Sequence, residues 1–313
     1  MKRVVSISLG TSKRDKSAVT TIGGEEIRIE RIGTDGDKRR FARLVAELDG
    51  RVDCFGVGGT DAYLHAGTRR YAFRETLRLM EGARATPWVD GSGLKHTLER
   101  ETVRYLDEKG IVPFGNIAVL LVAAVDRFGM AEALAARARS IVFGDLIYGL
   151  GIPVPIRSWR TLQVLARIAL PLVVRVPIEW LYPTGAKQEQ TVPRFPRFFE
   201  RADVVAGDWH IIRRNMPERL DGKVVLTQSS RAAEVELLKR RGVRMLVTTT
   251  PEIAGEAFAT NVMEAVLVVL SGRRPDELTP EWYLGRLRDL GWRPSIRRFD
   301  DSQPVLNSDP LHS

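Results

Sequence analysis

The sequence predicts an α/β protein with two α/β domains, the C-terminal one a Rossmann-like doubly wound parallel sheet. Nine apolar residues run without alternation from Ile117 to Val125, which is typical of a parallel strand buried on both faces. Strand-like runs and helical periodicity then alternate, as they do in doubly wound sheets. A chain of 313 residues, 44% of them hydrophobic, is also long enough for two domains.

An N-terminal α/β domain is expected over residues 1–110, and we expect it to bind the substrate. Short apolar runs bounded by glycine or polar turns mark its strands, and stretches with one apolar face mark its helices. The segment from Lys109 to Gly115 is typical of a linker, so we place the domain boundary near Gly110. The expected strands are 4–8, 27–32, 52–56 and 86–89, with a hairpin over 62–73 and helices over 38–48, 74–81 and 95–108.

The C-terminal domain is expected over residues 111–275, followed by an extension over 276–313. An apolar helix from Val262 to Leu270 is expected to be buried and to return to pack on the N-terminal domain. The tail from Asp300 is rich in turn-forming residues and is expected to fray. Further strands are expected within 201–208, 222–227 and 244–251, and a further helix within 234–241.

An inserted segment near residues 152–194 interrupts this minimal pattern. It carries several prolines, Trp159 and Trp180, and the loop from Pro183 to Glu189. Insertions of this length often form a lid or an oligomer surface. We expect a substrate lid or the contact of a homodimer here, and the alternative is a simple packing excursion.

The stretch from Ile117 to Asp145 has the layout of a dinucleotide-binding βαβ unit. The apolar strand is followed by a turn, an Ala-rich helix that ends near Ala138, and a second strand from Ile141 to Phe143. Asp145 then stands about where the fingerprint requires a carboxylate for the ribose hydroxyls. The residues expected to contact the cofactor are Ala124, Val125, Asp126, Arg127, Phe128, Gly129 and Asp145.

The turn departs from the Gly-x-Gly-x-x-Gly fingerprint, because Ala124 and Asp126 stand where its first two glycines are expected. A carboxylate about 4 Å from a phosphate costs roughly 1 to 4 kcal/mol, depending on the local dielectric constant. Two arrangements relieve this cost: Asp126 folds back as the helix N-cap, or Arg127 supplies a compensating cation. The alternative is a βαβ unit that binds no nucleotide.

Composition limits the class of protein. No apolar run reaches the roughly 18 residues of a membrane span. The N-terminus enters a strand pattern without a signal peptide, which favours the cytoplasm. Cys54 is the one cysteine, so we expect neither disulfides nor a metal site. The net charge of +9 is spread along the chain, which disfavours nucleic acid and favours a small anionic substrate.

Asp90 and Lys95 are candidate catalytic residues. Asp90 ends a predicted strand, and Lys95 falls in the first turn of the next helix, where a cation opposes the helix dipole. A lysine whose pKa is lowered by burial can transfer a proton during hydride transfer when a carboxylate lies beside it. The alternatives are a helix cap with a surface charge, formed together with Ser92, or a site that binds an anion.

A second cluster follows two later strands. Loops at the carboxyl ends of strands line the ligand crevice of an open sheet. We therefore expect Gly207 and Asp208 beside the cofactor, and His210 as a catalytic acid or base near neutral pH. Thr249 and Thr250 are expected to contact cofactor or substrate through their hydroxyls. The alternatives are a hydrogen-bonded loop histidine and an ordinary turn.

Several segments carry a resemblance to a known family. They are Val5–Gly10, Ile32–Asp37, Val89–Lys95, Ala124–Leu134 and Thr249–Pro251. With these segments the chain resembles bacterial proteins described as quinate or shikimate 5-dehydrogenase-like, or as predicted amino-acid dehydrogenases. The resemblance spans most of the chain and implies a two-domain α/β dehydrogenase with a nicotinamide cofactor.

The same resemblance bears on the catalytic residues. In shikimate and quinate dehydrogenases a lysine at the end of an N-terminal strand pairs with the aspartate of a later Asn-Thr-Asp-Gly motif. Thr34-Asp35-Gly36 resembles part of that motif, but Asp35 precedes Lys95, which reverses the order of the family.

These features predict a cytoplasmic NAD(P)-dependent oxidoreductase that acts on a small polar, anionic hydroxyl or carbonyl compound. The acid at Asp145 favours NAD over NADP. The alternative is a non-enzymatic or degenerate Rossmann-like protein that binds a small ligand, in which Asp126 marks the loss of the pyrophosphate site. The sequence contains no Gly-x-Ser-x-Gly, Gly-Lys-Ser/Thr or His-Glu-x-x-His motif.

Overall fold

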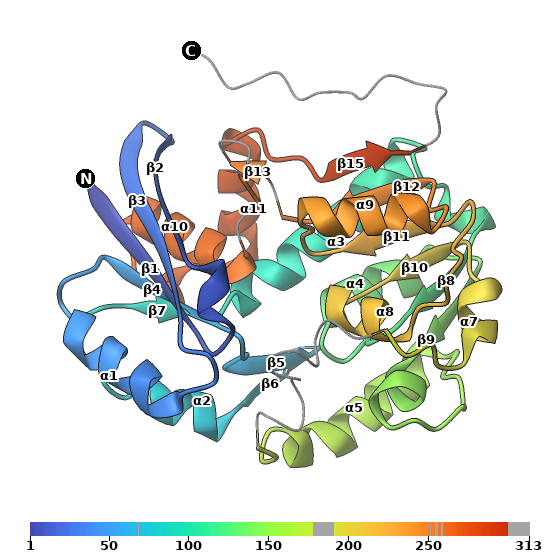
Figure 1. Ribbon diagram of the computed structural model, residues 1–313, viewed down its shortest axis with the longest axis horizontal. Helices are drawn as coiled ribbons and strands as arrows, with labels where there is room; N and C mark the ends of the chain where they lie inside the picture. Colours follow the sequence, from blue (N-terminus) through green and yellow to red (C-terminus); the bar gives the residue numbers. More distant parts are fainter. Residues whose placement is uncertain (68, 178–190, 251, 254–255, 258, 300–313) are drawn as a thin grey trace.

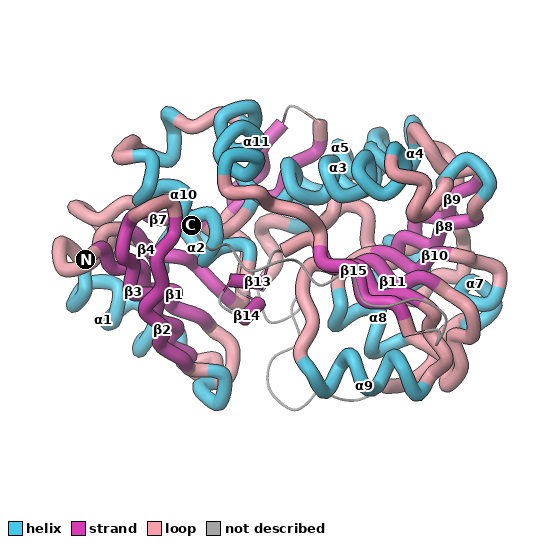
Figure 2. The backbone as a smooth tube through the Cα atoms, turned by 90° about the horizontal axis from the view of Figure 1, so that it is seen from above, coloured by secondary structure: helices cyan, strands magenta, loops and turns pink. Residues whose placement is uncertain are grey.

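The computed structural model describes residues 1–67, 69–177, 191–250, 252–253, 256–257 and 259–299. Two β-sheets, each covered by helices, lie side by side (Figures 1 and 2). The strands of one sheet come from residues 2–89 and those of the other from residues 118–298. No helix among the described residues is long and apolar enough to cross a bilayer.

The first sheet has the strand order β2-β3-β1-β4-β7, in which only β2 is antiparallel to its neighbour. The edge strand β2 was not expected, because its polar and charged residues alternate with few large apolar ones. The hairpin expected over residues 62–73 is confirmed as β5 and β6. The strands are β1 (Lys2–Ser8), β2 (Lys16–Ile22), β3 (Glu25–Gly33), β4 (Cys54–Gly58), β5 (Tyr63–Ala66), β6 (Arg69–Ala72) and β7 (Trp88–Val89).

Helices cover both faces of this sheet. On one face Phe41 of α1 (Lys38–Leu48) and Leu79 of α2 (Arg74–Leu79) pack on Val5 of β1. On the other face lies α10 (Thr260–Ser271), which comes from the far end of the chain (Figure 1). The expected return of this apolar helix to the N-terminal domain is therefore confirmed.

The second sheet has the order β15-β12-β11-β10-β8-β9, and every strand except β15 is parallel. Successive residues of β8 point to opposite faces, since Val119 and Leu121 join one core and Leu120 joins the other. The chain goes from β8 first to one neighbour, β9, and then to the other, β10, which creates a switch point. The predicted doubly wound α/β class is confirmed.

The elements of this second part are as follows. The strands are β8 (Ala118–Leu121), β9 (Ser140–Phe143), β10 (Val204–Ala206), β11 (Val224–Thr227), β12 (Met245–Thr248) and β15 (Ser295–Arg298), with the short pair β13 (Glu252–Ile253) and β14 (Glu256–Ala257). The helices are α3 (Ser92–Glu108), α4 (Phe128–Ala135), α5 (Trp159–Val173), α7 (Pro196–Glu200), α8 (Trp209–Asn215), α9 (Ala232–Arg240) and α11 (Pro280–Asp289). One-turn helices span Ser12–Arg14, Phe114–Asn116 and Pro275–Glu277, and a π-helical turn spans Asp145–Gly149.

Helix α3 joins the two halves. It packs on α4 of the second half and also on α10 and α11, which cover the first sheet. The ends of the chain and the insertion are only partly described. Helix α5 lies in the segment 152–194, whereas residues 178–190, with Trp180 and the expected loop from Pro183, and the tail 300–313 lie outside the described residues.

Candidate functional site

The turn after β8 is closed by Asp145. Its carboxylate accepts hydrogen bonds from the backbone N–H of Ala124, at 3.0 and 3.1 Å, and of Val125, at 2.9 Å. The expected nine-residue strand therefore ends at Leu121, because these amides turn away from the sheet toward Asp145. Burial raises the pKa of Asp145 to about 6, although the amide hydrogen bonds act in the opposite direction. The oxygens predicted for the ribose face the turn instead.

The N-terminus of α4 is covered by α3. The N–H of Gly129 donates to Nδ1 of His96 at 3.2 Å, and the N–H of Met130 donates to Glu99 Oε2 at 3.3 Å. A Cβ at Gly129 would lie 2.7 Å from the backbone oxygen of His96. Gly129 is thus required by the close approach of two helices. The amides that would hold a diphosphate here already have protein acceptors.

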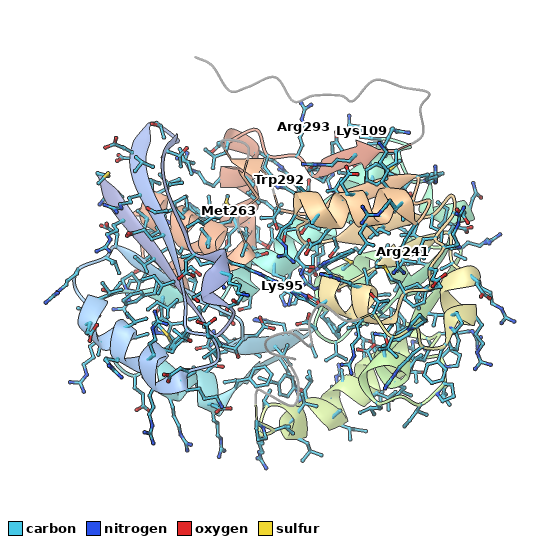
Figure 3. All side chains as sticks on the ribbon, viewed as in Figure 1. Lys95, Lys109, Arg241, Met263, Trp292 and Arg293 are labelled. Atoms are coloured by element: carbon cyan, nitrogen blue, oxygen red, sulfur yellow. The ribbon has the colours of Figure 1, made fainter. Side chains whose placement is uncertain are left out.

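A chain of ion pairs runs past this turn. Lys95 Nζ lies 2.8 Å from Asp126 Oδ1 and 3.9 Å from Asp61 Oδ2. Arg127 contacts Asp126 at 3.3 Å, Asp208 at 3.1 Å and Glu99 at 2.8 Å. Lys95 lies between the two halves of the molecule in Figure 3. The prediction that Arg127 supplies a cation beside Asp126 is confirmed, whereas Asp126 is not the N-cap of α4, a position held by Arg127.

The charge states follow from these contacts. Burial and Arg127 lower the pKa of Lys95, but Asp126, Asp61 and Glu99 outweigh them, so its pKa is raised. Burial raises the pKa of Asp126, yet Lys95 and Arg127 hold it below its usual range. The condition that catalysis by Lys95 requires, a pKa lowered by burial, is therefore not met: Lys95 is a paired cation at neutral pH.

The carboxyl ends of the later strands are joined by hydrogen bonds. Asp208 Oδ1 accepts from the N–H groups of His210 and Ile211 and so caps α8. Asp208 Oδ2 accepts from the side-chain amide of Gln228, with Nε2 at 3.0 Å. The backbone carbonyl of Gln228 accepts from the hydroxyl of Thr250 at 2.7 Å. The predicted residues Asp208, Thr249 and Thr250 thus lie on one edge of the sheet. This edge is the one that bears ligands in doubly wound folds.

The other predicted residues have packing roles. A Cβ at Gly207 would lie 2.8 Å from Val122 Cγ2, so this glycine lets two strand ends approach. Asp90 accepts from the N–H groups of Ala62, Tyr63 and Ser92 at 2.7 to 3.0 Å, so it anchors two turns and does not contact Lys95. The alternative of a helix cap with a surface charge holds only in part. Asp90 accepts from Ser92, but the N-cap of α3 is Gly91 without a side-chain cap hydrogen bond, and the Lys95 side chain is only 11% exposed. Phe128 begins α4 and packs on Trp159.

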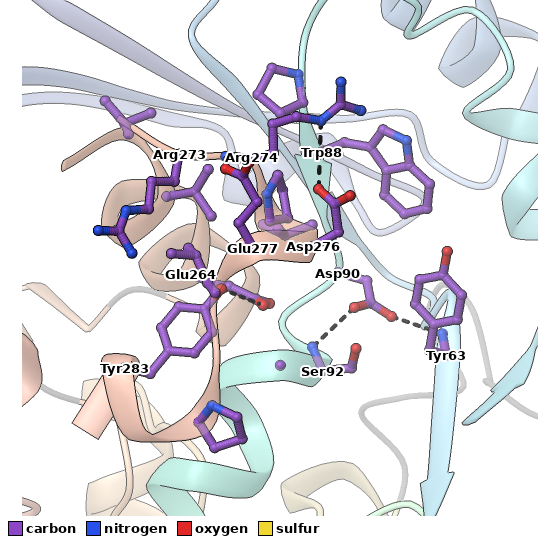
Figure 4. Close-up of a pocket in the computed structure, with 18 of the residues that line it drawn as sticks. Tyr63, Trp88, Asp90, Ser92, Glu264, Arg273, Arg274, Asp276, Glu277 and Tyr283 are labelled. Atoms are coloured by element: carbon purple, nitrogen blue, oxygen red, sulfur yellow. Dashed lines mark hydrogen bonds and ion pairs between the residues drawn. The ribbon is translucent and has the colours of Figure 1, made fainter. Parts of the chain in front are cut away.

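A cavity of about 1230 Å³ opens on the other side of the α3 N-terminus (Figure 4). Tyr63 and Trp88 form one wall, with ring centroids 6.1 Å apart and planes 3° from parallel. Tyr283 and Glu264 form the opposite wall. His96, which accepts a hydrogen bond from the N–H of Gly129, and Phe128, the first residue of α4, also line the cavity.

Glu264 is the most unusual group in this cavity. The hydroxyl of Tyr283 donates to its Oε1 at 3.2 Å, and Oε2 has no hydrogen-bond partner among the described residues. Burial raises the pKa of Glu264 to about 8, and the charge of Asp90 acts in the same direction. At neutral pH Glu264 is therefore a carboxylic acid that can donate a hydrogen bond.

Two histidines also line the cavity. His65 and His96 pack edge to face at 4.9 Å, and burial lowers the pKa of both. Since His96 Nδ1 accepts from Gly129, the ring proton of neutral His96 lies on Nε2. The histidines that line the cavity are therefore neutral, and His96 carries a donor at Nε2.

At neutral pH the charged side chains that line the cavity carry a net positive charge. The lining contains six basic and five acidic side chains, but Asp90 is used by three backbone amides and Glu264 keeps its proton at neutral pH. Arg70 lies over the ring of Tyr63, with Cζ 4.3 Å from the centroid. The described residues contain no group of three His, Cys, Asp or Glu side chains arranged to hold a metal ion.

The sequence did not reveal Glu99, His96 or Glu264 as site residues. Each lies inside a helix whose sequence pattern is amphipathic or apolar, and the pattern does not distinguish a functional polar residue in such a helix from one that is only tolerated. An acid inside the apolar run 262–270 was the one signal that pointed to Glu264, because a buried carboxyl group requires a partner or a raised pKa.

Two family models match the chain. The model described as Domain of unknown function (DUF8754) matches residues 93–299, and Domain of unknown function (DUF8753) matches residues 3–90. The chain belongs to the DUF8754 family. The two matches meet between β7 and α3, and the DUF8754 match includes α10 and α11, which cover the first sheet.

Similar solved structures include both enzymes and binding proteins. The NAD-dependent malic enzyme from Thermotoga maritima is 12% identical with a TM-score of 0.35, and the match covers 92% of this chain and 84% of that one. A galactofuranose binding protein is 13% identical with a TM-score of 0.36, covering 93% and 100%. L-tryptophan dehydrogenase from Nostoc punctiforme is 9% identical with a TM-score of 0.29, covering 85% and 67%. No curated protein sequence matches the chain.

Proposed function

We propose that this protein binds a small polar molecule bearing a carboxylate or another oxyanion in the cavity between Trp88 and Tyr283. The observation that carries the proposal is that two neutral donors, Glu264 and His96, line the same cavity as Arg70, whose Cζ lies 4.3 Å from the centre of the Tyr63 ring. Pockets of this kind, with convergent polar groups and perturbed pKa values, are the usual sites of ligands. This corresponds to the ligand-binding alternative drawn from the sequence.

Each part of the cavity has a task in this proposal. The stacked rings of Tyr63 and Trp88 offer an apolar face to the carbon skeleton of the ligand. Protonated Glu264 and the Nε2–H of His96 donate to its oxygens. Arg70, which lies over the ring of Tyr63, supplies long-range attraction for its charge.

A titration series tests the proposal. Quinate, shikimate and malate, with neutral inositol as control, are titrated into the protein by calorimetry at several pH values. We expect binding of at least one acid and none of inositol. Affinity falls as the pH rises through the pKa of Glu264, about 8, because an ionised carboxylate repels the probe.

Variants make the test specific. Glu264→Gln keeps a neutral donor, so it removes the loss of affinity at high pH. Arg70→Gln weakens binding at every pH, roughly two- to tenfold for one exposed charge. Exposed Arg51→Gln, outside the cavity, changes nothing. No heat with any acid, or equal effects of the two arginine variants, would sink the proposal.

A second candidate is the NAD(P)-dependent oxidoreductase related to quinate or shikimate 5-dehydrogenases. The switch point next to β8 and the hydroxyls of Thr249 and Thr250 on the same edge favour it. The turn itself does not fit a diphosphate as it stands, because Asp145 occupies the amides of Ala124 and Val125. We therefore derive no reaction step through the cofactor.

Nucleotide titration separates the two candidates. NAD, NADP and their reduced forms are each titrated into the protein, with and without a bound acid from the first series. Heat with NAD or NADP supports the oxidoreductase, and the absence of heat with all four nucleotides contradicts it. Binding of an acid without binding of any nucleotide supports the ligand-binding function and excludes the oxidoreductase.

A further inference from the structure

Helix α5 exposes an apolar face. Of the ten large hydrophobic side chains that are exposed in the described part of the chain, seven lie between Leu150 and Leu172. On α5 itself Val164, Ile168 and Leu172 follow one another at four-residue spacing, so they form one stripe along the helix. Ile168 and Leu172 are 66% and 63% exposed.

The exposed stripe is distinct from the face of α5 that packs in the hydrophobic core. The opposite side of α5 is the buried one, since Leu162, Ala166 and Leu170 are at most 1% exposed. Ala166 and Leu170 pack with Leu64 and Phe73 of the hairpin region. The helix is thus held in place by one apolar side and offers a second one outward, along the lower rim of the molecule in Figure 1.

The charged residues of this segment all have one sign. Residues 146–178 contain four arginines, Arg157, Arg160, Arg167 and Arg175, and no lysine, aspartate or glutamate. All four arginines are exposed. An exposed apolar stripe in a segment whose only charges are arginines is typical of a helix that lies in the interface of an anionic membrane.

A second copy of the chain fits this face less well. Symmetric pairing of α5 with α5 would bring eight arginines together without an acid from either segment, and like charges at an interface oppose association. A bilayer with anionic headgroups offers both an apolar layer and the opposite charge. We propose that α5 and the preceding segment from Leu150 dock on the surface of an anionic phospholipid membrane.

Vesicle sedimentation tests the proposal. The full chain is mixed with vesicles of phosphatidylcholine alone or of phosphatidylcholine with phosphatidylglycerol. We expect the protein to sediment with the mixed vesicles at low salt, to be released at high salt, and to stay in solution with phosphatidylcholine alone.

Two variants locate the contact. Ile168→Ser with Leu172→Ser removes the stripe, and Arg160→Gln with Arg167→Gln removes half of the charge; each lowers the bound fraction at least tenfold. The matched control, Val19→Ser with Arg51→Gln, changes an exposed hydrophobic residue and a cation elsewhere and binds as the wild type does. Circular dichroism verifies that each variant is folded.

Three outcomes contradict the proposal. One is the absence of sedimentation with mixed vesicles, and another is equal binding of all variants. The third is a wild-type dimer in sedimentation velocity that becomes a monomer in Ile168→Ser with Leu172→Ser, because a second copy would then cover the stripe.

Discussion

The guanidinium of Arg127 donates to the carboxylate of Glu99 at 2.8 Å, and their side chains are 7% and 1% exposed. This pair ties α4 to α3 and so fixes the second sheet to the helix that joins the two halves. Burial raises the pKa of Glu99, while Arg127 lowers it, so the acid depends on its partner for its charge.

Breaking this pair should be costly. Arg127→Met leaves a buried carboxylate without its cation, and we expect a loss of about 3 to 5 kcal/mol in the free energy of unfolding. Adding Glu99→Leu to Arg127→Met should recover part of this loss, because no unpaired charge remains at Glu99. Urea denaturation of the single and double variants measures both values. A double variant less stable than either single one would contradict this account.

Glu264 should make stability fall as pH rises. Its pKa is about 8 in the folded chain and 4.5 by its ordinary value. Between these values the unfolded chain releases the proton and the folded chain keeps it, so stability falls over this window and then levels off. The linkage relation gives a loss on the order of 5 kcal/mol.

Glu264→Gln isolates this effect. The variant keeps Asp145, whose pKa of about 6 gives a dependence of the same sign at lower pH. The difference between wild type and variant should therefore grow from pH 4.5 to pH 8, with the variant becoming the more stable of the two. Urea midpoints at a series of pH values give this difference, and parallel curves would rule out the raised pKa.

The two glycines Gly129 and Gly285 should respond oppositely to alanine. A Cβ at Gly129 would meet backbone atoms of His96 at 2.7 and 2.9 Å, so Gly129→Ala forces α3 and α4 apart at a cost of about 1 to 3 kcal/mol. Gly285 lies in α11 with nothing within 4 Å of a Cβ, and Gly285→Ala should stabilise by about 0.4 to 1 kcal/mol. Thermal unfolding of both variants compares them directly.

Asp145→Ala should loosen the turn after β8. The N–H groups of Ala124 and Val125 lose their acceptor, which costs about 1 to 3 kcal/mol for each group that stays unsatisfied. Asp145→Asn keeps one oxygen acceptor and should cost less. Amide hydrogen exchange at Ala124 and Val125 should become faster in the alanine variant. Unchanged exchange would show that Asp145 does not hold these amides in solution.

The positions of the buried strands were predictable, and the contacts of the acids were not. The apolar run near Val119 and the second strand near Val142 gave the βαβ unit, because burial on both faces leaves a clear pattern. An acid after the second strand fits a ribose contact and a closed turn equally well in sequence. The sequence therefore placed Asp145 correctly at the end of the second strand but could not predict its contact. Only the fold shows that its carboxylate accepts from the N–H of Ala124.

The same limit applies to the charged residues. Lys95 was singled out because it opposes a helix dipole, yet its partners Asp61 and Asp126 lie 34 and 31 positions away and no local pattern joins them. Glu264 was hidden in a helix recognised only as apolar. Local periodicity predicts which face of a helix is buried, but it does not tell which buried acid meets which base.

Helix α10 imposes an order of events on the newly made chain. Asn261 Nδ2 donates to Ser6 Oγ at 2.9 Å across 255 positions of sequence, in the core of the first sheet. During translation, one apolar face of the first sheet therefore stays uncovered until α10 and most of the polypeptide have left the ribosome. A fragment that stops at β7 is expected to aggregate, so the boundary between the two family matches does not separate two independently folding units.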